Sequence, residues 1–377
     1  MRTPSTELPA LTGLRGFAAL WVLLLHVWFF AGEPALQLWS GGPAFGPFFN
    51  LGWAGVDVFF CLSAFLLAMP FARWRYDGAP RPDTGRYLWR RTLRIYPAYL
   101  LQLGILLGIA TLTGEGRLLD LRELVAHVFL WFNMGRDWVA PLVGVWFTLP
   151  IEFAFYLLLP FLAPMLDRGR WPWLLVGAVA VTLGWRVLAY GLVAAEPVPI
   201  RVVEIERLPG RIDQFVIGML AGAAFVASLS SGWRPRRRAL WFWGGVAGCT
   251  LLLAALYVVR ADYWDGHPLL FVWHGLFSAS LLPVLLAAAW GDRSAVMLFG
   301  SRVLRHLGRV SFGVYLWHMP IVLAVLPHIP AAWGAATKLA VLLAIVLPAT
   351  LIVAQASFVL VERPLLERGR RARLPAA

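Results

Sequence analysis

Eleven apolar runs separated by short polar segments set the class of fold that this chain can adopt. Ten of the runs hold 20 or more residues, which is about the length that an α-helix needs to cross a bilayer. The chain is 60% hydrophobic and 14% charged, whereas a soluble domain is about a quarter charged. It lacks the alternating segments of about ten residues that a membrane barrel shows. The sequence therefore predicts an all-α polytopic membrane protein. The runs are 9–30, 48–71, 87–113, 121–134, 142–166, 172–193, 209–230, 239–259, 269–290, 307–326 and 336–361.

Arginines gather in alternate segments between the runs, and this pattern predicts the topology. The segments 71–94, 167–171, 231–238 and 291–309 and the C-terminal tail are rich in arginine, whereas 31–47 has no basic residue. Basic loops stay in the cytoplasm. Strict alternation then requires 114–141 to remain on the outer side, and the run 121–134 is too short to span comfortably. We expect about ten spans with both termini cytoplasmic, and a short interfacial or re-entrant helix near 121–134.

The net charge of +13 comes almost entirely from arginines between apolar runs. We interpret these arginines as topology signals and as contacts for phosphate or anionic headgroups, and not as a surface that binds nucleic acid. Cys61 and Cys249 lie in apolar runs without metal-binding spacing and are expected to be buried thiols. The first run lacks a cleavage site and is predicted to be a permanent span. We expect one integral-membrane domain over 1–366 and a short basic cytoplasmic tail over 367–377.

The first run places an arginine and a histidine in one span, Arg15 and His26. Eleven residues make about three helical turns, so the two side chains share one face of the helix and lie about 16 Å apart along it. By the predicted topology, Arg15 is nearer the cytoplasm. An arginine near a helix end can snorkel to the surface, and a lone histidine can be a packing residue.

Further polar residues lie inside other runs, and their number favours a functional site. An unpaired charge at the bilayer centre costs at least about 2.5–3.5 kcal/mol, so these side chains must face one another or a wet cavity. Some can form structural ion pairs, which is the simplest interpretation of Arg211 and Asp213. The remaining polar residues inside the runs are Asp57, Glu152, the arginines Arg90, Arg91 and Arg94, and a stripe on one helix formed by Ser311, Tyr315 and His318.

This set of residue types suits a directional transfer reaction. Arginine is the preferred side chain for phosphate, so an inner arginine cluster can hold a nucleotide-bearing donor. Histidine titrates near neutral pH and can accept a hydroxyl proton, while a carboxylate fixes its tautomer. The sequence has no P-loop, no nucleophile elbow and no metal-binding motif, so no metal is expected.

The ordered strings "LTGLRGFAALWVLLLH", "GVDVFFCLSAFLL", "RRTLRIYPAY", "WFTLPIEFAFYLLLP", "LGRVSFGVYLWHMP" and "VERP" resemble the integral-membrane acyltransferase-3 family of sugar and antibiotic O-acyltransferases. The resemblance runs from about residue 8 to 366 and is to the stand-alone form, without the SGNH hydrolase-like domain of many relatives. It implies a ten-helix bundle in the bacterial cytoplasmic (inner) membrane. It also implies a cytoplasmic acyl-CoA donor, usually acetyl-CoA, and a hydroxyl acceptor on a carbohydrate or glycolipid.

The family's Arg-x10-His motif corresponds to Arg15 and His26, and its arginine-rich segment to Arg90, Arg91 and Arg94. Its acidic residue corresponds to Glu152, and its late Tyr-Leu-Trp-His to Tyr315 and His318. Two departures are Ala64, where the family usually has glycine, and Phe147, which lies between Trp146 and Thr148.

We therefore expect O-acyl transfer from acyl-CoA to a hydroxyl of a cell-surface polysaccharide, lipid-linked glycan or macrolide sugar. His26 is the expected base, supported by Glu152 or Asp57, and His318 positions donor or acceptor. The arginine cluster holds the CoA phosphates, with Tyr315 beside the donor, and Arg15 joins them or orients the thioester. The alternative is a proton-coupled transporter using the same buried histidines and carboxylates, but the inverted repeats and paired broken helices typical of carriers are absent from the sequence.

Overall fold

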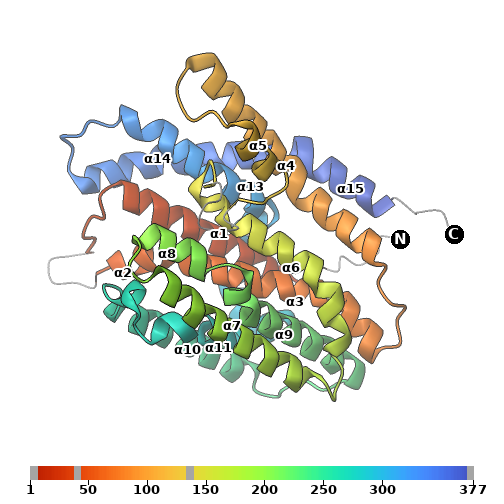
Figure 1. Cartoon of the computed structure of the whole chain (residues 1–377). Helices are drawn as coiled ribbons and strands as arrows, with labels where there is room; N and C mark the ends of the chain where they lie inside the picture. The colour runs from red at the N-terminus through yellow and green to blue at the C-terminus, as the bar shows by residue number, and fades with distance from the viewer. Residues whose placement is uncertain (1–6, 38–43, 133–139, 372–377) are drawn as a thin grey trace. The chain divides into compact units, whose positions relative to one another are not determined.

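The computed structural model describes residues 7–37, 44–132 and 140–371, and nearly all of the regular structure in them is helical (Figure 1). The helices are α1 (Pro9–Phe30), α2 (Gly46–Asn50), α3 (Ala54–Tyr76), α4 (Thr84–Thr113), α5 (Leu121–Val128), α6 (Thr148–Leu162), α7 (Trp171–Val193), α8 (Val198–Ile205), α9 (Ile212–Ser231), α10 (Arg238–Val258), α11 (Leu269–Ala289), α12 (Arg293–Phe299), α13 (Arg302–Val325), α14 (Ala335–Ser357) and α15 (Arg363–Arg371). Short 3₁₀ turns include η1 (Leu51–Trp53), η2 (Gly144–Phe147), η4 (Leu208–Arg211), η5 (Tyr263–Asp265) and η6 (Leu326–His328), and a π-helical turn, η7 (Phe358–Glu362), joins α14 to α15.

Ten helical segments of the described residues are long and apolar enough to cross a membrane, which confirms the predicted number. Several combine neighbouring elements, such as η2, α6 and the 3₁₀ turn η3 (Ala163–Met165) over Gly144–Met165, and η4 with α9 over Leu208–Ser231. The orientation of the termini stays a prediction.

The run at 121–134 forms only the eight-residue helix α5. Eight residues rise about 12 Å, which is less than half of the hydrocarbon thickness. A capping box sets its start, because the Asp120 side chain accepts the Glu123 backbone N–H while Glu123 reaches back to the Asp120 N–H. The expectation that this run does not span is therefore confirmed for its described part; residues 133 and 134 lie outside the described residues.

The chain divides into two compact units that interleave along the sequence. The first comprises Met1–Val22, Pro47–Pro82 and Leu158–Arg309, and the second Leu23–Gly46, Asp83–Leu157 and Val310–Ala377. Four of the five boundaries fall within helices, in α1, α2, α6 and α13, so each of these helices contributes residues to both units.

In the first unit, α3 and α9 lie side by side and form its most extensive helix pair (Figure 1). Glycines allow this approach, because a Cβ added to Gly218 would lie 2.4 Å from the Cys61 carbonyl oxygen, and one added to Gly222 would lie 2.3 Å from that of Phe65. The four-residue spacing of small residues is typical of close helix packing in membranes. The helices α7 and α11 pack against this pair, and α10 packs against α11.

In the second unit, α4 contacts the C-terminal segment of η7 and α15. The helices α13 and α14 approach closely at Gly313, where an added Cβ would lie 3.0 Å from the Ala354 Cα.

Candidate active site

His26 and His318 lie together in the second unit. The His318 Nε2 is 3.2 Å from the His26 Nδ1, and the ring centroids are 5.0 Å apart. His318 is completely buried, whereas His26 is partly exposed. Both residues were predicted from the sequence as site residues, but the contact between the two rings was not.

The hydrogen bonds around this pair assign its tautomers. The His318 Nδ1 lies 3.1 Å from the Val314 carbonyl oxygen, which can only accept, so His318 Nδ1 carries a proton and donates it. In the neutral ring, Nε2 is then an acceptor, and the His26 Nδ1 must donate to it. The basic lone pair of His26 therefore lies on Nε2, which is the arrangement of a general base oriented by a second group.

Tyr315 holds the helix that carries His318 against the start of α6. Its hydroxyl lies 2.8 Å from the Thr148 Oγ1 and donates to the Val145 carbonyl. Its ring centroid is 5.9 Å from that of His318. Tyr315 is buried, so its contacts position the histidine pair.

Gln102 of α4 is a residue that the sequence analysis missed. Pro320 has no N–H, so the carbonyl of Leu316, four residues earlier in α13, has no helical donor. The Gln102 Nε2 donates to this carbonyl at 2.7 Å, and the Gln102 Oε1 accepts the indole N–H of Trp146 at 2.9 Å. The combination of a proline in "YLWHMP" with a glutamine in another span is a signal that could have identified it. Gln102 thus completes the turn on which His318 lies.

The three arginines predicted to bind the donor, Arg90, Arg91 and Arg94, all lie in α4 but have different surroundings in the second unit. The Arg94 Nη1 lies 3.1 Å from the Glu362 Oε2, and its guanidinium lies over the Phe312 ring at 5.5 Å. The Arg90 Nε donates to the Gly369 carbonyl at 3.4 Å. The C-terminal segment therefore fixes two of the predicted donor-binding residues.

Arg91 and Glu152 share a neighbour in Tyr156. The Arg91 guanidinium lies 6.0 Å from the centre of the Tyr156 ring, and the Tyr156 hydroxyl donates to the Glu152 carboxylate. The structure thus brings Glu152 into the surroundings of an arginine of α4.

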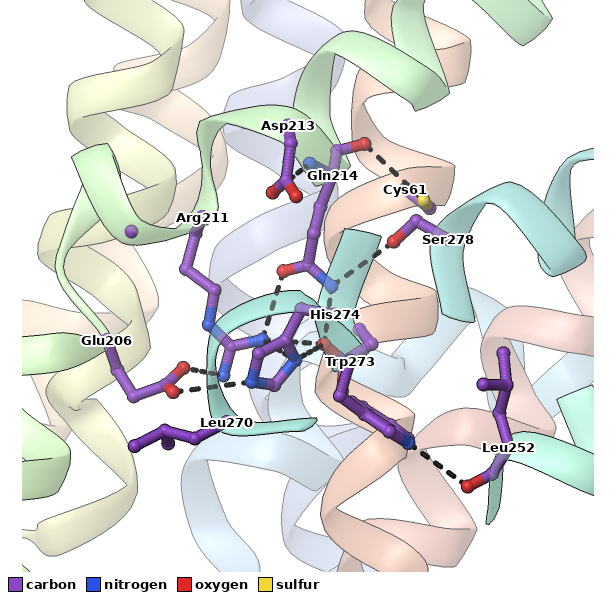
Figure 2. A network of polar contacts seen from close by, with 12 residues as sticks. Cys61, Glu206, Arg211, Asp213, Gln214, Leu252, Leu270, Trp273, His274 and Ser278 are labelled. Carbon is purple, nitrogen blue, oxygen red and sulfur yellow. Dashed lines mark hydrogen bonds and ion pairs between the residues drawn. The ribbon is translucent and has the colours of Figure 1, made fainter. Parts of the chain in front are cut away.

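Asp57 belongs to a buried ion network of the first unit, and Figure 2 shows its partners Arg211, Gln214 and His274. Its Oδ1 lies 2.6 Å from the Arg211 Nη1, 2.5 Å from the Gln214 Nε2 and 2.6 Å from the His274 Nδ1. Arg211 also pairs with Glu206, and Figure 2 shows its guanidinium beside the Glu206 carboxylate. Arg211 is therefore paired with Asp57 and Glu206, and the expected pair with Asp213 is replaced by these two.

Glu206 joins this network from residues 194–208, which lie between two of the predicted spans. Part of that segment forms α8, which directs Glu206 back toward Arg186 of α7, whose Nη2 lies 2.8 Å from the Glu206 Oε1. Burial raises the pKa of a carboxyl, but the charges of Arg186, Arg211 and His274 outweigh it and hold the pKa of Glu206 well below its usual range.

Arg15 lies half-buried in the part of α1 that belongs to the first unit. The next residue, Gly16, lets α1 approach α13, because a Cβ there would lie 2.1 Å from the Leu304 carbonyl oxygen. The continuous helix α1 carries both Arg15 and His26, as predicted. Among the described residues, no cluster of three or more histidine, cysteine, aspartate or glutamate side chains could hold a metal ion.

Comparison with known proteins identifies the class to which this architecture belongs. Residues 8–358 match the family described as acyltransferase domain, the acyltransferase-3 family, and this chain belongs to it. No solved structure matches the chain.

The chain is 30% identical to the acyltransferase MdmB of Streptomyces mycarofaciens, over 84% of this chain and 79% of that protein. It is 28% identical to the exopolysaccharide production protein ExoZ of Rhizobium meliloti, over 88% of this chain and 95% of ExoZ. It is also 26% identical to the peptidoglycan O-acetyltransferase OatA of Listeria monocytogenes, over 96% of this chain. The alignment covers 56% of OatA, so the chain spans little more than half of that protein. These relatives favour an acyltransferase and give no support to the transporter alternative.

Proposed function

We propose that this chain is a membrane O-acyltransferase that moves an acyl group from cytoplasmic acyl-CoA to a carbohydrate-type hydroxyl. Acetyl is the acyl group that we expect. The observation that carries the proposal is the His26–His318 pair, because its hydrogen bonds leave the lone pair of His26 on Nε2. Family membership and the similarity to OatA and ExoZ support the reaction class. The acceptor candidates are a cell-surface polysaccharide, a lipid-linked glycan and a macrolide sugar, and the location is the bacterial cytoplasmic membrane.

In this reaction His26 Nε2 takes the proton of the acceptor hydroxyl as its oxygen attacks the thioester carbonyl. A carbon–oxygen bond forms, the carbon–sulfur bond breaks, and the CoA thiolate leaves and recovers the proton from His26. His318 holds the His26 ring in the productive tautomer, and Tyr315 fixes the helix that carries His318. A positioned base contributes about 10²–10⁴-fold to such a step.

The donor end is assigned to the arginines of α4. Arg90 and Arg94 use one guanidinium nitrogen each on the C-terminal segment, and a guanidinium has five N–H donors, so both retain donors for the CoA phosphates. Arg91 lies beside them on α4, near Glu152 and Tyr156. Arg15 is proposed to orient the thioester. Asp57 is proposed to act indirectly, through the buried network around Arg211.

The test is acyl transfer by detergent-solubilised protein given radiolabelled acetyl-CoA and a panel of lipopolysaccharide, exopolysaccharide and macrolide acceptors. We expect CoA release that depends on the acceptor, and a loss of about 10²–10⁴-fold in His26→Ala. The matched control is His328→Ala, which removes an exposed histidine of η6 in the same unit. Near-normal turnover in correctly inserted His26→Ala protein would remove the central claim.

A further inference from the structure

A long apolar groove lies in the first unit, and none of its lining residues is among those proposed for acyl transfer. Its volume is about 580 Å³, and α7, α9 and α11 form its walls with Tyr76 of α3. Along α7 the lining residues are Trp171, Leu175, Val179 and Leu183, a strict four-residue stripe on one helix face. The groove therefore follows the helix axis rather than forming a rounded pocket.

The shape suits one hydrocarbon chain. The twelve residue steps from Trp171 to Leu183 rise about 18 Å, which exceeds half of a hydrocarbon core about 30 Å thick. The groove opens at the surface of the unit, since two of its lining residues are exposed there: Val179 is 37% exposed and Leu276 of α11 is 46% exposed. These helices are long and apolar enough to cross a membrane, so the medium at this opening is lipid.

The two ends of the groove differ. At one end the buried carboxylate of Asp213 lies against Gly275, where an added Cβ would be 2.4 Å from the Asp213 Oδ2. At the other end lie Tyr76, the last residue of α3, and Trp171, the first residue of α7. Aromatic residues at the ends of spans are typical of the membrane interface, so this second end lies at headgroup depth.

Four arginines lie close in sequence to the two aromatic residues at this end. Arg73 and Arg75 precede Tyr76 on α3, while Arg168 and Arg170 precede Trp171. Arg75 and Arg170 share the carboxylate of Asp167, and Asp77 bonds to Ser230. These two segments thus carry four arginines but only two aspartates, and exposed Arg168 has no ion pair among the described residues.

From this arrangement we propose that the groove binds one anionic phospholipid, with an acyl chain along α7 and its phosphate at the Arg168 end. The chain lies on the stripe of Leu175, Val179 and Leu183, and it ends before the Asp213 carboxylate. Each arginine near a membrane surface attracts an anionic headgroup by about 1 kcal/mol, which selects phosphatidylglycerol over a zwitterionic lipid with the same chains. This site does not rest on the proposed acyl transfer.

The test is native mass spectrometry of the delipidated full chain with equal amounts of phosphatidylglycerol and phosphatidylcholine that carry identical acyl chains. We expect one phosphatidylglycerol to be retained preferentially. Val179→Trp fills the groove and should abolish this binding, whereas Val181→Trp should not. Val181 is the matched control because it follows Val179 by two residues on α7, is 52% exposed and does not line the groove.

A second pair of variants tests the headgroup end. Arg168→Gln should lower the preference for phosphatidylglycerol by about fivefold, the factor that about 1 kcal/mol supplies. Arg260→Gln changes an arginine between α10 and α11 and should leave the preference unchanged. If Val179→Trp does not insert, Ala224→Phe narrows the same groove from α9. Equal retention of the two lipids by the unaltered chain, or equal binding by Val179→Trp and Val181→Trp, would overturn the proposal.

Discussion

Arg94 of α4 and Glu362 of the π-helical turn form an ion pair, with the Nη1 and Oε2 atoms 3.1 Å apart. Glu362 is almost completely buried, so its carboxylate has given up its hydration and depends on this partner. A π-helical turn is uncommon and is frequently found at functional sites. The pair links the predicted donor-binding segment to the "VERP" string, which the sequence analysis used only as a mark of resemblance.

The first prediction concerns Glu362 as a positioning residue for the donor. Glu362→Gln keeps the size of the side chain but removes its charge, so Arg94 is no longer held toward the CoA phosphates. We expect the KM for acetyl-CoA to rise about tenfold, as for the loss of one charged hydrogen bond, while kcat stays within about twofold. Glu367→Gln is the control, because Glu367 forms an exposed pair with Arg363 on the adjacent α15. A fall in kcat at constant KM would contradict this role.

The second prediction separates the two histidines. His318→Ala removes the acceptor of the His26 Nδ1 proton, so the His26 ring can adopt the unproductive tautomer. We expect kcat to fall by about 10²-fold, measured by acceptor-dependent CoA release. His318→Gln retains an acceptor oxygen and should recover part of this loss. If the alanine and glutamine variants are equally impaired, tautomer control is not what His318 contributes.

The number and approximate ends of the spans follow from the sequence, because length and hydropathy are local properties that the bilayer selects. Arg15 and His26 could be placed on one helix for the same reason. The pairing of His26 with His318 could not, because it joins residues 292 positions apart that no helical period relates.

The buried network around Asp57 shows the same limit. The sequence shows that an unpaired charge on Asp57 would be costly in hydrocarbon, so a partner was expected. The identity of the partners could not be predicted, because Arg211 and His274 are 154 and 217 residues away. Arg211 was assigned to Asp213 because the two are close in sequence. The helix α8 was missed because its eight residues mix charged and apolar side chains in a segment that reads as a loop.

The third prediction concerns the stability of the turn that carries His318. Gln102→Leu leaves the Leu316 carbonyl and the Trp146 indole N–H buried without partners. Each lost partner costs about 1–3 kcal/mol, so we expect a lower apparent Tm in detergent, by about 5 °C or more. Gln37→Leu, at an exposed position outside the spans, serves as the control. An unchanged Tm in Gln102→Leu would show that other groups satisfy these atoms.

The last prediction concerns pH and the buried His127 of α5. Its Nδ1 lies 2.7 Å from the Glu123 carbonyl oxygen and donates to it, while its Nε2 accepts the Leu142 backbone N–H at 2.9 Å. Protonation of Nε2 would break the second bond, and burial lowers the pKa of His127 below its ordinary value of 6.5. Because the folded pKa is below the unfolded one, this contribution to stability is fully present above about pH 6.5 and is lost as the pH falls through the folded pKa.

Thermal unfolding between about pH 7.5 and 5 should therefore show a steeper fall of the apparent Tm with decreasing pH for the unaltered chain than for His127→Asn, which cannot titrate. His306→Asn, at an exposed position of α13, should retain the steep loss. Parallel profiles for the unaltered chain and His127→Asn would assign the acid sensitivity to other groups.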